Sequence, residues 1–435
     1  MFQNLINHIN HHLPFLKDKK LLLAISGGID SMVLLHLFSK MNREIAVAHC
    51  NFQLRGAESD GDEEFVKIQC EKLKIKSFIQ QFETEKFAQE NKLSIQQSAR
   101  SLRYHWFEEI QTKEGFDYLL TAHHLDDSLE TFLINFTRGT GIEGLTGIPQ
   151  INGKIVRPLL IFSREEIKKY AEENNIDWRE DSSNASDKYF RNKIRHQVVP
   201  ILKELNPSLL NSFQNTVHNL QQTQQIAQKE IDTQWTAVST IDGENCYLAL
   251  DKIKSLAQYP AYLYAWLQPY GFTAWEDIAD LVEAQSGKQI LSAHYRLIKD
   301  RTHLILSPIN KKSEEEYVIV ETDFQIDFPI KLTFCNQSYI STPTSTSIFV
   351  DKEKLKFPLQ LRKWKEGDYF YPSGMQGKKK VSKFFKDEKF SLVEKENTWL
   401  LCADNEIIWI VNHRADQRFL ATSKTKNIIN INLLK

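Results

Sequence analysis

The sequence lacks the cysteine patterns that hold disulfides or metals. Its 435 residues contain five cysteines, an odd number, and no two of them are spaced as C-x-x-C. Such scattered cysteines argue against a disulfide framework, a zinc knuckle and a cysteine-held cluster. We therefore expect a reducing compartment and predict a cytoplasmic protein. The cysteines are Cys50, Cys70, Cys246, Cys335 and Cys402.

Long apolar runs are also missing. No run approaches the roughly 20 residues that cross a bilayer. Residues 1–20 have the pattern of a short amphipathic helix rather than of a basic, apolar and cleavable leader. We therefore expect neither export nor insertion into a membrane.

Neither sign of charge is in excess, with 55 basic and 56 acidic side chains. A polyanionic partner would have to be met by a local basic patch, because the overall field does not attract it. The hydrophobic share of 41% and the charged share of 26% are typical of globular proteins, which excludes a disordered or fibrous chain. At roughly 100 to 200 residues per domain, the length predicts two to four domains.

The P-loop motif G-x-x-x-x-G-K-[ST] is absent as well, so transfer of a γ-phosphate by that route is not supported. Residues 139–144 match G-x-G-x-x-G, the dinucleotide-binding pattern. They follow a predicted helix instead of a strand, and we therefore interpret them as a surface loop.

Short apolar runs alternate with helical periods over the first 140 residues. The apolar run 21–25 has the length of a strand, ends close to two glycines and precedes a helical period over 31–41. Repeated strand–turn–helix units are typical of a parallel sheet with helices on both faces, so we predict a doubly wound α/β domain. Further strands are predicted at 44–49, 77–82 and 118–122, and further helices at 63–73, 94–111, 125–136, 164–173 and 192–202.

A glycine-rich bend separates the first predicted strand from its helix. Glycines let the backbone approach a ligand closely, and the N-terminus of the following helix favours an anion. The bend therefore predicts a phosphate site, and an embedded carboxylate, Asp30, is a candidate ligand for Mg²⁺, which prefers oxygen. The residues of the predicted nucleotide site are Ser26, Gly27, Gly28, Ile29, Asp30 and Ser31.

A second polar cluster, His-His-Leu-Asp-Asp over residues 123–127, follows the strand predicted at 118–122. Asp127 and Glu130 are about one helical turn apart and are expected to face one pocket. They are candidates for holding the ammonium of an amine substrate, and His123 or a carboxylate is a candidate for accepting its proton. A simpler alternative is that Asp126 and Asp127 only cap the helix.

The bend resembles the signature of the PP-loop, or N-type, ATP pyrophosphatase family, a HUP-like fold. Further stretches resemble the lysidine-forming branch of that family. They are residues 122–127 with Glu130 and Thr131, Arg157-Pro158-Leu159-Leu160, Glu180-Asp181-Ser182-Ser183-Asn184, Arg191-Asn192-Lys193-Ile194-Arg195, and, near the end, Gly367-Asp368 with residues 378–385.

The resemblance implies an ATP-dependent ligase that uses Mg²⁺. Its expected reaction adenylates the wobble cytidine of an isoleucine tRNA with a CAU anticodon, joins L-lysine to C2 of that base, and releases pyrophosphate and AMP. The modified tRNA would read AUA instead of AUG. Because leaving phosphates need positive charge, Arg103 and Arg195 join His123, Asp127 and Glu130 as catalytic candidates. A homodimer is left open.

Two other activities of the family remain as alternatives. One is a tRNA thiolase, for which the chain lacks paired cysteines, and the other is an enzyme of the NAD synthetase type, which would not need a lysine-rich domain. An amidotransferase would need a glutaminase unit, for which no spare domain is seen. A purely RNA-binding module would leave both polar motifs without a purpose.

Two smaller domains are predicted after the α/β catalytic domain, residues 1–205. A glutamine-rich helical period over 211–229 leads into a mainly helical or mixed tRNA-contacting domain, 206–312. Short alternating runs with Gly and Pro turns indicate a β-rich tRNA-binding domain, 313–435.

A lysine-rich segment of the last domain is a candidate contact for RNA, with phenylalanines as stacking surfaces. A solvated turn between strands is the alternative. Trp364 and Trp399 are predicted to be core residues. The segment contains Lys378, Lys379, Lys380, Lys383, Lys386 and Lys389, interleaved with Phe384, Phe385 and Phe390.

Overall fold

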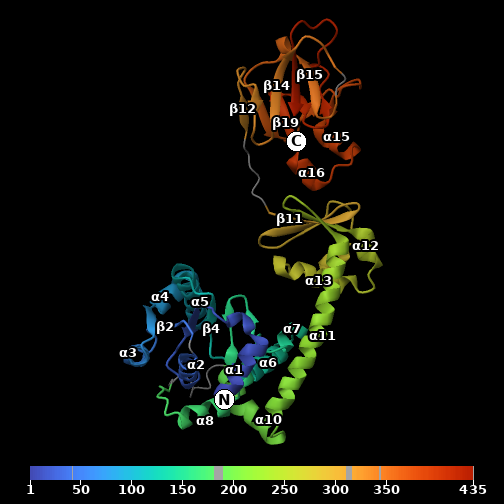
Figure 1. The fold of residues 1–435 in the computed structure, drawn as a ribbon. Helices are drawn as coiled ribbons and strands as arrows, with labels where there is room; N and C mark the ends of the chain where they lie inside the picture. Colours follow the sequence, from blue (N-terminus) through green and yellow to red (C-terminus); the bar gives the residue numbers. More distant parts are fainter. Residues whose placement is uncertain (42, 181–189, 310–315, 342–343, 435) are drawn as a thin grey trace. The chain divides into compact units, whose positions relative to one another are not determined.

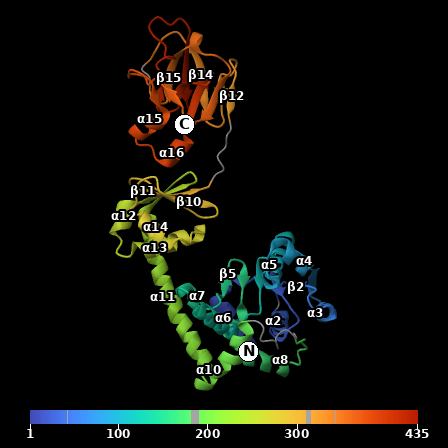
Figure 2. The ribbon, with the colours of Figure 1, turned by 180° about the vertical axis from the view of Figure 1, so that it is seen from behind.

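The structure is a computed structural model that describes residues 1–41, 43–180, 190–309, 316–341 and 344–434. The chain forms two compact units, Met1–Gln228 and Lys229–Lys435, which Figures 1 and 2 show from opposite sides. Within the described ranges, no helix is both long and apolar enough to cross a membrane.

The first unit is built on a six-stranded sheet with the order β3-β2-β1-β4-β6-β5. All neighbouring strands run parallel except the last pair, β6 and β5. The predicted parallel sheet is therefore confirmed, and the antiparallel edge hairpin is an addition to it. The strands are β1 (Leu21–Ala24), β2 (Ile45–Asn51), β3 (Lys76–Gln81), β4 (Tyr118–Leu120), β5 (Ile151–Asn152) and β6 (Ile155–Val156).

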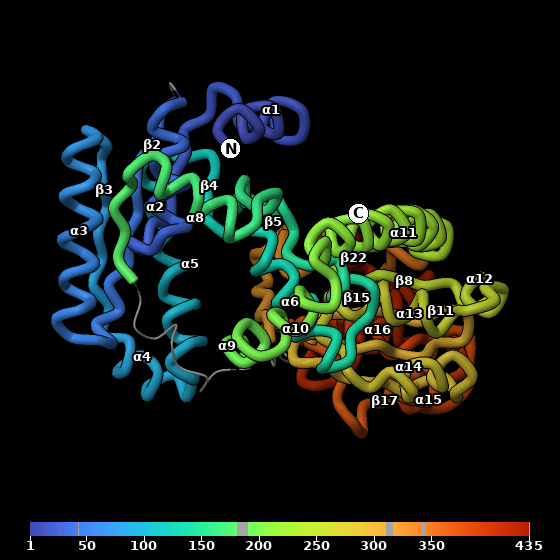
Figure 3. The backbone as a smooth tube through the Cα atoms, turned by 90° about the horizontal axis from the view of Figure 1, so that it is seen from below, coloured from blue at the N-terminus to red at the C-terminus, as the bar shows by residue number. Residues whose placement is uncertain are grey.

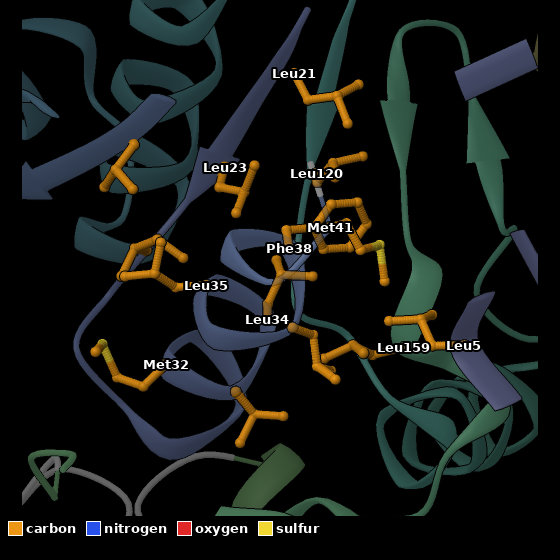
Figure 4. Close-up of a cluster of buried hydrophobic side chains, with 14 of the residues drawn as sticks. Leu5, Leu21, Leu23, Met32, Leu34, Leu35, Phe38, Met41, Leu120 and Leu159 are labelled. Atoms are coloured by element: carbon orange, nitrogen blue, oxygen red, sulfur yellow. The ribbon is translucent and has the colours of Figure 1, made fainter. Parts of the chain in front are cut away.

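Helices cover both faces of this sheet, as a doubly wound fold requires. On one face, Leu21 and Leu23 of β1 pack with residues of α2 such as Leu34 and Phe38, as Figure 4 shows. On the other face, Leu22 packs in a separate cluster with residues of α5. β1 is apolar on both sides for this reason, which explains the continuous apolar run 21–25.

The helices of the first unit agree with most of the predicted ones; α4 and the short α7 are additions. α3 lies beside β2 and β3 at one end of the sheet (Figure 3). They are α1 (Phe2–His12), α2 (Ile29–Ser39), α3 (Ala57–Leu73), α4 (Thr84–Asn91), α5 (Ile95–Glu114), α6 (Leu125–Arg138), α7 (Ile142–Leu145), α8 (Arg164–Glu173), α9 (Phe190–Lys193), α10 (Val199–Leu205) and α11 (Leu209–Val238), which continues into the second unit.

The strand order places a switch point between β1 and β4. From β1 the chain continues to β2 and β3 on one side of the sheet, and it then crosses to β4 on the other side. In open α/β sheets, ligands bind at such a point, outside the carboxyl ends of the strands. The loops after β1 and β4 carry the two polar motifs. Residues 139–141 form a surface loop after α6, as predicted, but residues 142–144 belong to the short helix α7.

The second unit begins with an antiparallel sheet of order β7-β8-β11-β10-β9 and three helices. The predicted helices of this region are thus accompanied by a sheet. Its elements are β7 (Ser239–Asp242), β8 (Asn245–Ala249), α12 (Leu250–Ser255), α13 (Tyr259–Leu267), α14 (Trp275–Leu281), β9 (Gln289–Leu291), β10 (Tyr295–Lys299) and β11 (His303–Pro308).

The remainder of the second unit is rich in β-structure, as predicted. Two antiparallel sheets, β12-β16-β19-β20-β21 and β13-β14-β22-β15, enclose one core. The elements are β12 (Tyr317–Ile319), β13 (Gln325–Ile326), β14 (Leu332–Gln337), β15 (Ser347–Asp351), β16 (Leu359–Lys363), β17 (Tyr369–Phe370), β18 (Lys379–Lys380), α15 (Val381–Asp387), α16 (Leu392–Asn397), β19 (Trp399–Ala403), β20 (Glu406–Ile410), β21 (Arg414–Ala415) and β22 (Ile428–Leu433).

The lysine-rich segment divides its side chains between two environments. Phe384 and Phe385 of α15 are buried at 3% and 0% exposure, and Phe390 packs against the same cluster. The prediction that these rings serve as stacking surfaces for bases is therefore wrong, because they pack in the hydrophobic core. Trp364 and Trp399 pack against core clusters, as predicted. The exposed lysines are Lys378, Lys380, Lys383, Lys386 and Lys389.

Candidate active site

The bend after β1 is held by the side chain of the helix that follows it. Gly27 has a φ of +94°, in the left-handed region that favours glycine. The Ser31 hydroxyl accepts hydrogen bonds from the backbone N–H groups of Ser26 and Gly27, both at 3.2 Å, and donates one to the Gly28 carbonyl at 2.8 Å. These bonds fix the bend at the N-terminus of α2, where the first N–H groups of the helix, which have no intrahelical partner, and the helix dipole attract phosphate.

Asp30 lies in the first turn of α2, and one of its carboxylate oxygens is unsatisfied. The atom Oδ1 is buried and has no hydrogen-bond partner among the described residues. Its nearest ionisable contact is His124, whose Nε2 lies 3.7 Å away. Burial raises the pKa of Asp30, and the nearby charge of Asp127 adds to the rise. A cation at this oxygen would relieve both effects.

The loop after β4 caps the N-terminus of α6 and also contributes side chains to the site. His124 caps α6 by accepting a hydrogen bond from the Asp127 N–H at 3.4 Å, and Asp127 Oδ2 accepts one from the His124 N–H at 3.1 Å. The capping role predicted as the simpler alternative is thus real for this oxygen. The other oxygen, Oδ1, accepts from Arg195 Nη2 at 3.1 Å. One carboxylate therefore both caps the helix and positions an arginine.

Asp126, its neighbour, holds other parts of the fold together. It accepts hydrogen bonds from the Lys203 ammonium of α10 and from the Arg164 N–H at the start of α8, both at 2.8 Å. Both of its carboxylate oxygens are used in these contacts. Asp126 is therefore a structural residue.

Glu130 joins two arginines at the centre of the site. It is 2% exposed, and its carboxylate accepts from Arg195 Nε at 2.5 Å and from Arg191 Nε at 2.9 Å. Arg191 also donates to the Thr131 hydroxyl at 3.1 Å. Such charge-assisted bonds fix both guanidinium groups with little freedom.

A π-turn, Ile194–Val198, lies between α9 and α10 and carries Arg195. Single π-turns inside helices often occur at functional sites. Arg191 and Arg195, four residues apart, both point to Glu130 from this segment. The sequence predicts a plain helix here, so the π-turn is a finding of the structure.

The charges of the cluster are mutually stabilised. Burial by itself would raise the pKa of Asp127, but His124 and Arg191 outweigh it and lower that pKa. Burial would likewise lower the pKa of Arg195, whereas its bonds to Glu130 raise it. Asp127 and Arg195 therefore stay charged at neutral pH, and positive charge is held next to the phosphate bend.

Comparison with known proteins agrees with this site. The PP-loop domain matches residues 1–202, the TilS substrate binding domain matches 241–309, and the TilS substrate C-terminal domain matches 359–432. The tRNA(Ile)-lysidine synthase of Bacteroides thetaiotaomicron is 41% identical over 98% of both chains, and that of Parabacteroides distasonis is 39% identical over 96% of both. The chain belongs to the tRNA(Ile)-lysidine synthase family.

A more distant relative carries the same name. The tRNA(Ile)-lysidine synthase of Bacillus subtilis is 32% identical over 92% of this chain and 91% of its own. The similarity thus includes both units. As members of the PP-loop family use ATP, the chain has an ATP-binding domain in residues 1–202.

The structure places the two remaining catalytic candidates, His123 and Arg103, in different parts of the first unit. His123 lies beside the cluster, with its Nδ1 2.9 Å from the Thr121 hydroxyl, and burial lowers its pKa to about 4. Arg103 lies elsewhere, on the exposed side of α5, with its guanidinium 5.1 Å from the centre of the Phe52 ring. The described contacts bring together Asp30, Asp127, Glu130 and Arg195, and Arg103 is not among them.

Sequence reasoning missed Arg191 and His124 as members of the site. Both are part of motifs that were recognised, but no role was assigned to either. The spacing of Arg191 and Arg195 by four residues was a usable signal, because such residues share one side of a helix. No local signal pairs them with Glu130, which is 65 residues from Arg195 in the sequence. Residues 181–184 of the Glu180 motif lie outside the described residues.

The residues at the bend fit a magnesium ion that is shared with a nucleotide. Asp30 offers one buried oxygen that has no protein partner in the described part of the chain. Among the described residues there is no group of three or more carboxylate, His or Cys side chains that would enclose a metal. A carboxylate oxygen next to a phosphate-binding bend fits Mg²⁺, which is typically bound by one or two carboxylates together with substrate phosphates.

Proposed function

We propose that this protein is a carbon–nitrogen ligase that uses ATP to join L-lysine to C2 of the wobble cytidine of the isoleucine tRNA with a CAU anticodon. Full-length similarity to proteins named tRNA(Ile)-lysidine synthase supports the activity. One observation carries the assignment of the site: the carboxylate–arginine cluster of Asp127, Glu130 and Arg195 lies beside the phosphate bend through Asp30 and His124.

The first chemical step is adenylation of the base. The cytidine O2 attacks the α-phosphorus of ATP, the bond to the β-phosphate oxygen breaks, and pyrophosphate leaves. Negative charge grows on the phosphates, so fixed donors that face them lower the barrier. The bend would bind the phosphates through its N–H groups, and Arg195 and Arg191 would face the developing charge. Bound Mg²⁺, held by Asp30, would supply further positive charge to the phosphates.

The second step is attack by lysine. The ε-amine, with a reference pKa of about 10.4, must first lose a proton. Its nitrogen then bonds to C2 of the cytidine while the bond from C2 to the adenylated oxygen breaks, and AMP leaves with that oxygen. Asp127 is the carboxylate that we assign to orient the ammonium. Both oxygens of Glu130 accept from arginines, whereas among the described residues one oxygen of Asp127 accepts only from the His124 N–H. Glu130 therefore acts mainly by holding Arg191 and Arg195.

His123 is the residue that we assign to receive the proton. Because burial lowers its pKa to about 4, the ring is neutral at pH 7 and can accept a hydrogen bond or a proton. So weak a base does not itself deprotonate an ammonium to completion. Its part is to take the second proton, which the nitrogen loses as the new carbon–nitrogen bond forms and its acidity rises; the first proton, lost from the ammonium before attack, goes to water.

The proposed function is tested by lysine incorporation. Purified protein with ATP and Mg²⁺ should transfer labelled lysine to an isoleucine tRNA that bears the CAU anticodon. The elongator methionine tRNA, which has the same anticodon, is the matched control. Equal labelling of both tRNAs would contradict the proposed specificity, and labelling of neither would contradict the activity.

A further inference from the structure

A phenylalanine and an arginine form an exposed pair next to the active site. Phe190 is 46% exposed, and the Arg138 guanidinium lies over its ring at 5.7 Å from the centre. Arg138 is itself exposed and forms no ion pair with any of the described residues. Exposed single phenylalanines are ordinary, but an aromatic face next to an arginine with no ion pair in the described part of the chain offers base stacking and phosphate binding together.

Phe190 of this pair is the sequence neighbour of Arg191, which contacts the proposed catalytic cluster. Phe190 directly precedes Arg191, whose side chain contacts Glu130, the Asp127 carbonyl and the Thr131 hydroxyl. The position of Phe190 is therefore tied to that of a proposed catalytic arginine. Lys193, three residues further on, is exposed and adds positive charge to the same segment.

Helix geometry places Arg138 on the catalytic side of α6. Arg138 follows Asp127 by 11 residues, which is three turns plus about 20°, so the two side chains lie on one side of the helix about 16 Å apart. Phe136, which is 65% exposed, follows Asp127 by nine residues, or about two and a half turns, and lies on the opposite side. Phe136 therefore lies on the side of α6 opposite Asp127, whereas Phe190 contacts Arg138, which lies on the same side as Asp127.

We propose that Phe190 and Arg138 form a stacking platform for an unpaired base of the anticodon loop that neighbours the reacting cytidine. This inference rests on the proposed function. Proteins recognise RNA loops by stacking splayed bases on aromatic rings and guanidinium planes, and arginines next to the ring bind the phosphates. The pair has both groups, and Arg138 lies on the same side of α6 as Asp127.

The test compares Phe190→Ala with Phe136→Ala, a matched control at a more exposed phenylalanine. Phe190→Ala should raise the KM for tRNA about tenfold, as expected for the loss of one stacked base. Its KM for ATP and lysine should stay the same, and Phe136→Ala should match the wild type in all three. Equal effects of the two substitutions on the KM for tRNA, or no effect of Phe190→Ala, would overturn the proposal.

Two further variants separate stacking from apolar packing. Phe190→Tyr keeps an aromatic face and should keep the KM for tRNA, whereas Phe190→Leu keeps apolar volume and should behave like Phe190→Ala. A leucine variant with wild-type KM would overturn the platform. Wild-type turnover in the same assay tests the proposed function separately, because a failure of that function would leave no lysine incorporated by any variant.

Discussion

Two basic regions of this chain hold their charges in opposite ways. Arg191 and Arg195 are fixed by carboxylates of α6, and Glu130 at their centre is 2% exposed. The lysines of the segment 378–389 are mostly exposed, and only Lys379 has an ion pair among the described residues, with Asp387 at 2.7 Å. The first arrangement is suited to placing charge at a reacting atom, and the second to general attraction of a polyanion.

The comparison shows why arginine and lysine serve these two regions. A guanidinium has several donors in a rigid plane, so several bonds can set its orientation. An ammonium on a flexible stem acts as a point charge and tolerates many positions of a phosphate. We therefore expect substitutions in the first region to affect chemistry and substitutions in the second to affect binding of RNA.

The largest effect is expected for Asp127→Ala. It removes the carboxylate that we assign to the lysine ammonium, and lysine transfer should be abolished while ATP binding stays largely intact. Transfer of labelled lysine and equilibrium binding of ATP measure the two properties. A loss of nucleotide affinity would instead assign Asp127 to the ATP site.

Asp126→Asn is the control at the adjacent residue. Its carboxylate binds Lys203 and the start of α8, so the variant should lose stability, by about 3 kcal/mol, rather than a specific step of the chemistry. Thermal unfolding and turnover at a temperature where the variant is folded would distinguish the two. A fully stable but inactive Asp126→Asn would contradict the structural role.

Arg195→Lys should have the next largest effect. It keeps the charge but loses the fixed plane between Asp127 and Glu130, and adenylation should slow about 10²- to 10³-fold. Arg191→Lys should be milder, because the Arg191 side chain is 41% exposed, against 20% for Arg195. Release of pyrophosphate in a single turnover measures both, and the reverse order would contradict the assigned roles.

A smaller effect concerns pH. His123 is buried, its pKa is about 4 in the folded protein, and the ordinary value is 6.5. Between pH 4 and pH 6.5, His123 is protonated in the unfolded chain but neutral in the folded protein. The free energy of unfolding is therefore highest above pH 6.5 and falls as the pH drops toward 4. At pH 5 the loss should be about 2 kcal/mol.

His123→Gln should reduce this pH dependence. Unfolding by urea at pH 7 and at pH 5 measures it, with His8→Gln as a second variant, because the pKa of His8 is also lowered to about 4 by burial. An unchanged difference between the two pH values in His123→Gln would show that this ring does not stay neutral in the folded protein.

The smallest effect is expected in the second region. Replacement of Lys380, Lys383 and Lys386 by Gln should weaken tRNA binding and reduce the slope of log affinity against log salt by about 0.7 to 0.9 for each phosphate that the variant no longer neutralises. Lys424→Gln with Lys426→Gln, two exposed lysines of the same unit, is the control. Equal slopes in the two variants would remove the segment 378–389 from the RNA-binding surface.

Much of the first unit was predictable because its sequence is locally consistent. The apolar run 21–25 and the glycines after it specify β1 and the bend without help from distant residues. The partners of the candidate catalytic side chains were not predictable in this way. Glu130 meets Arg195 only because the fold brings α6 and the π-turn together, and neither the turn nor the ion pair has a local signature.

The second region shows a signal that was present but missed. Val381, Phe384 and Phe385 are spaced by three and four residues, which is the spacing of a buried helix face. The same helix leaves Lys383 and Lys386 on its exposed side. The aromatic residues were therefore identifiable as core from the sequence, and the lysines as surface.

The most direct test of the site is adenylation without lysine. ATP labelled on the α-phosphate would be mixed in a single turnover with the CAU isoleucine tRNA, and the label on RNA would be followed. We predict that labelled AMP becomes attached to the tRNA with release of pyrophosphate, and that added lysine then discharges it as AMP. Cleavage of ATP to ADP and phosphate, with no label on the RNA, would contradict the assignment of the bend and its arginines.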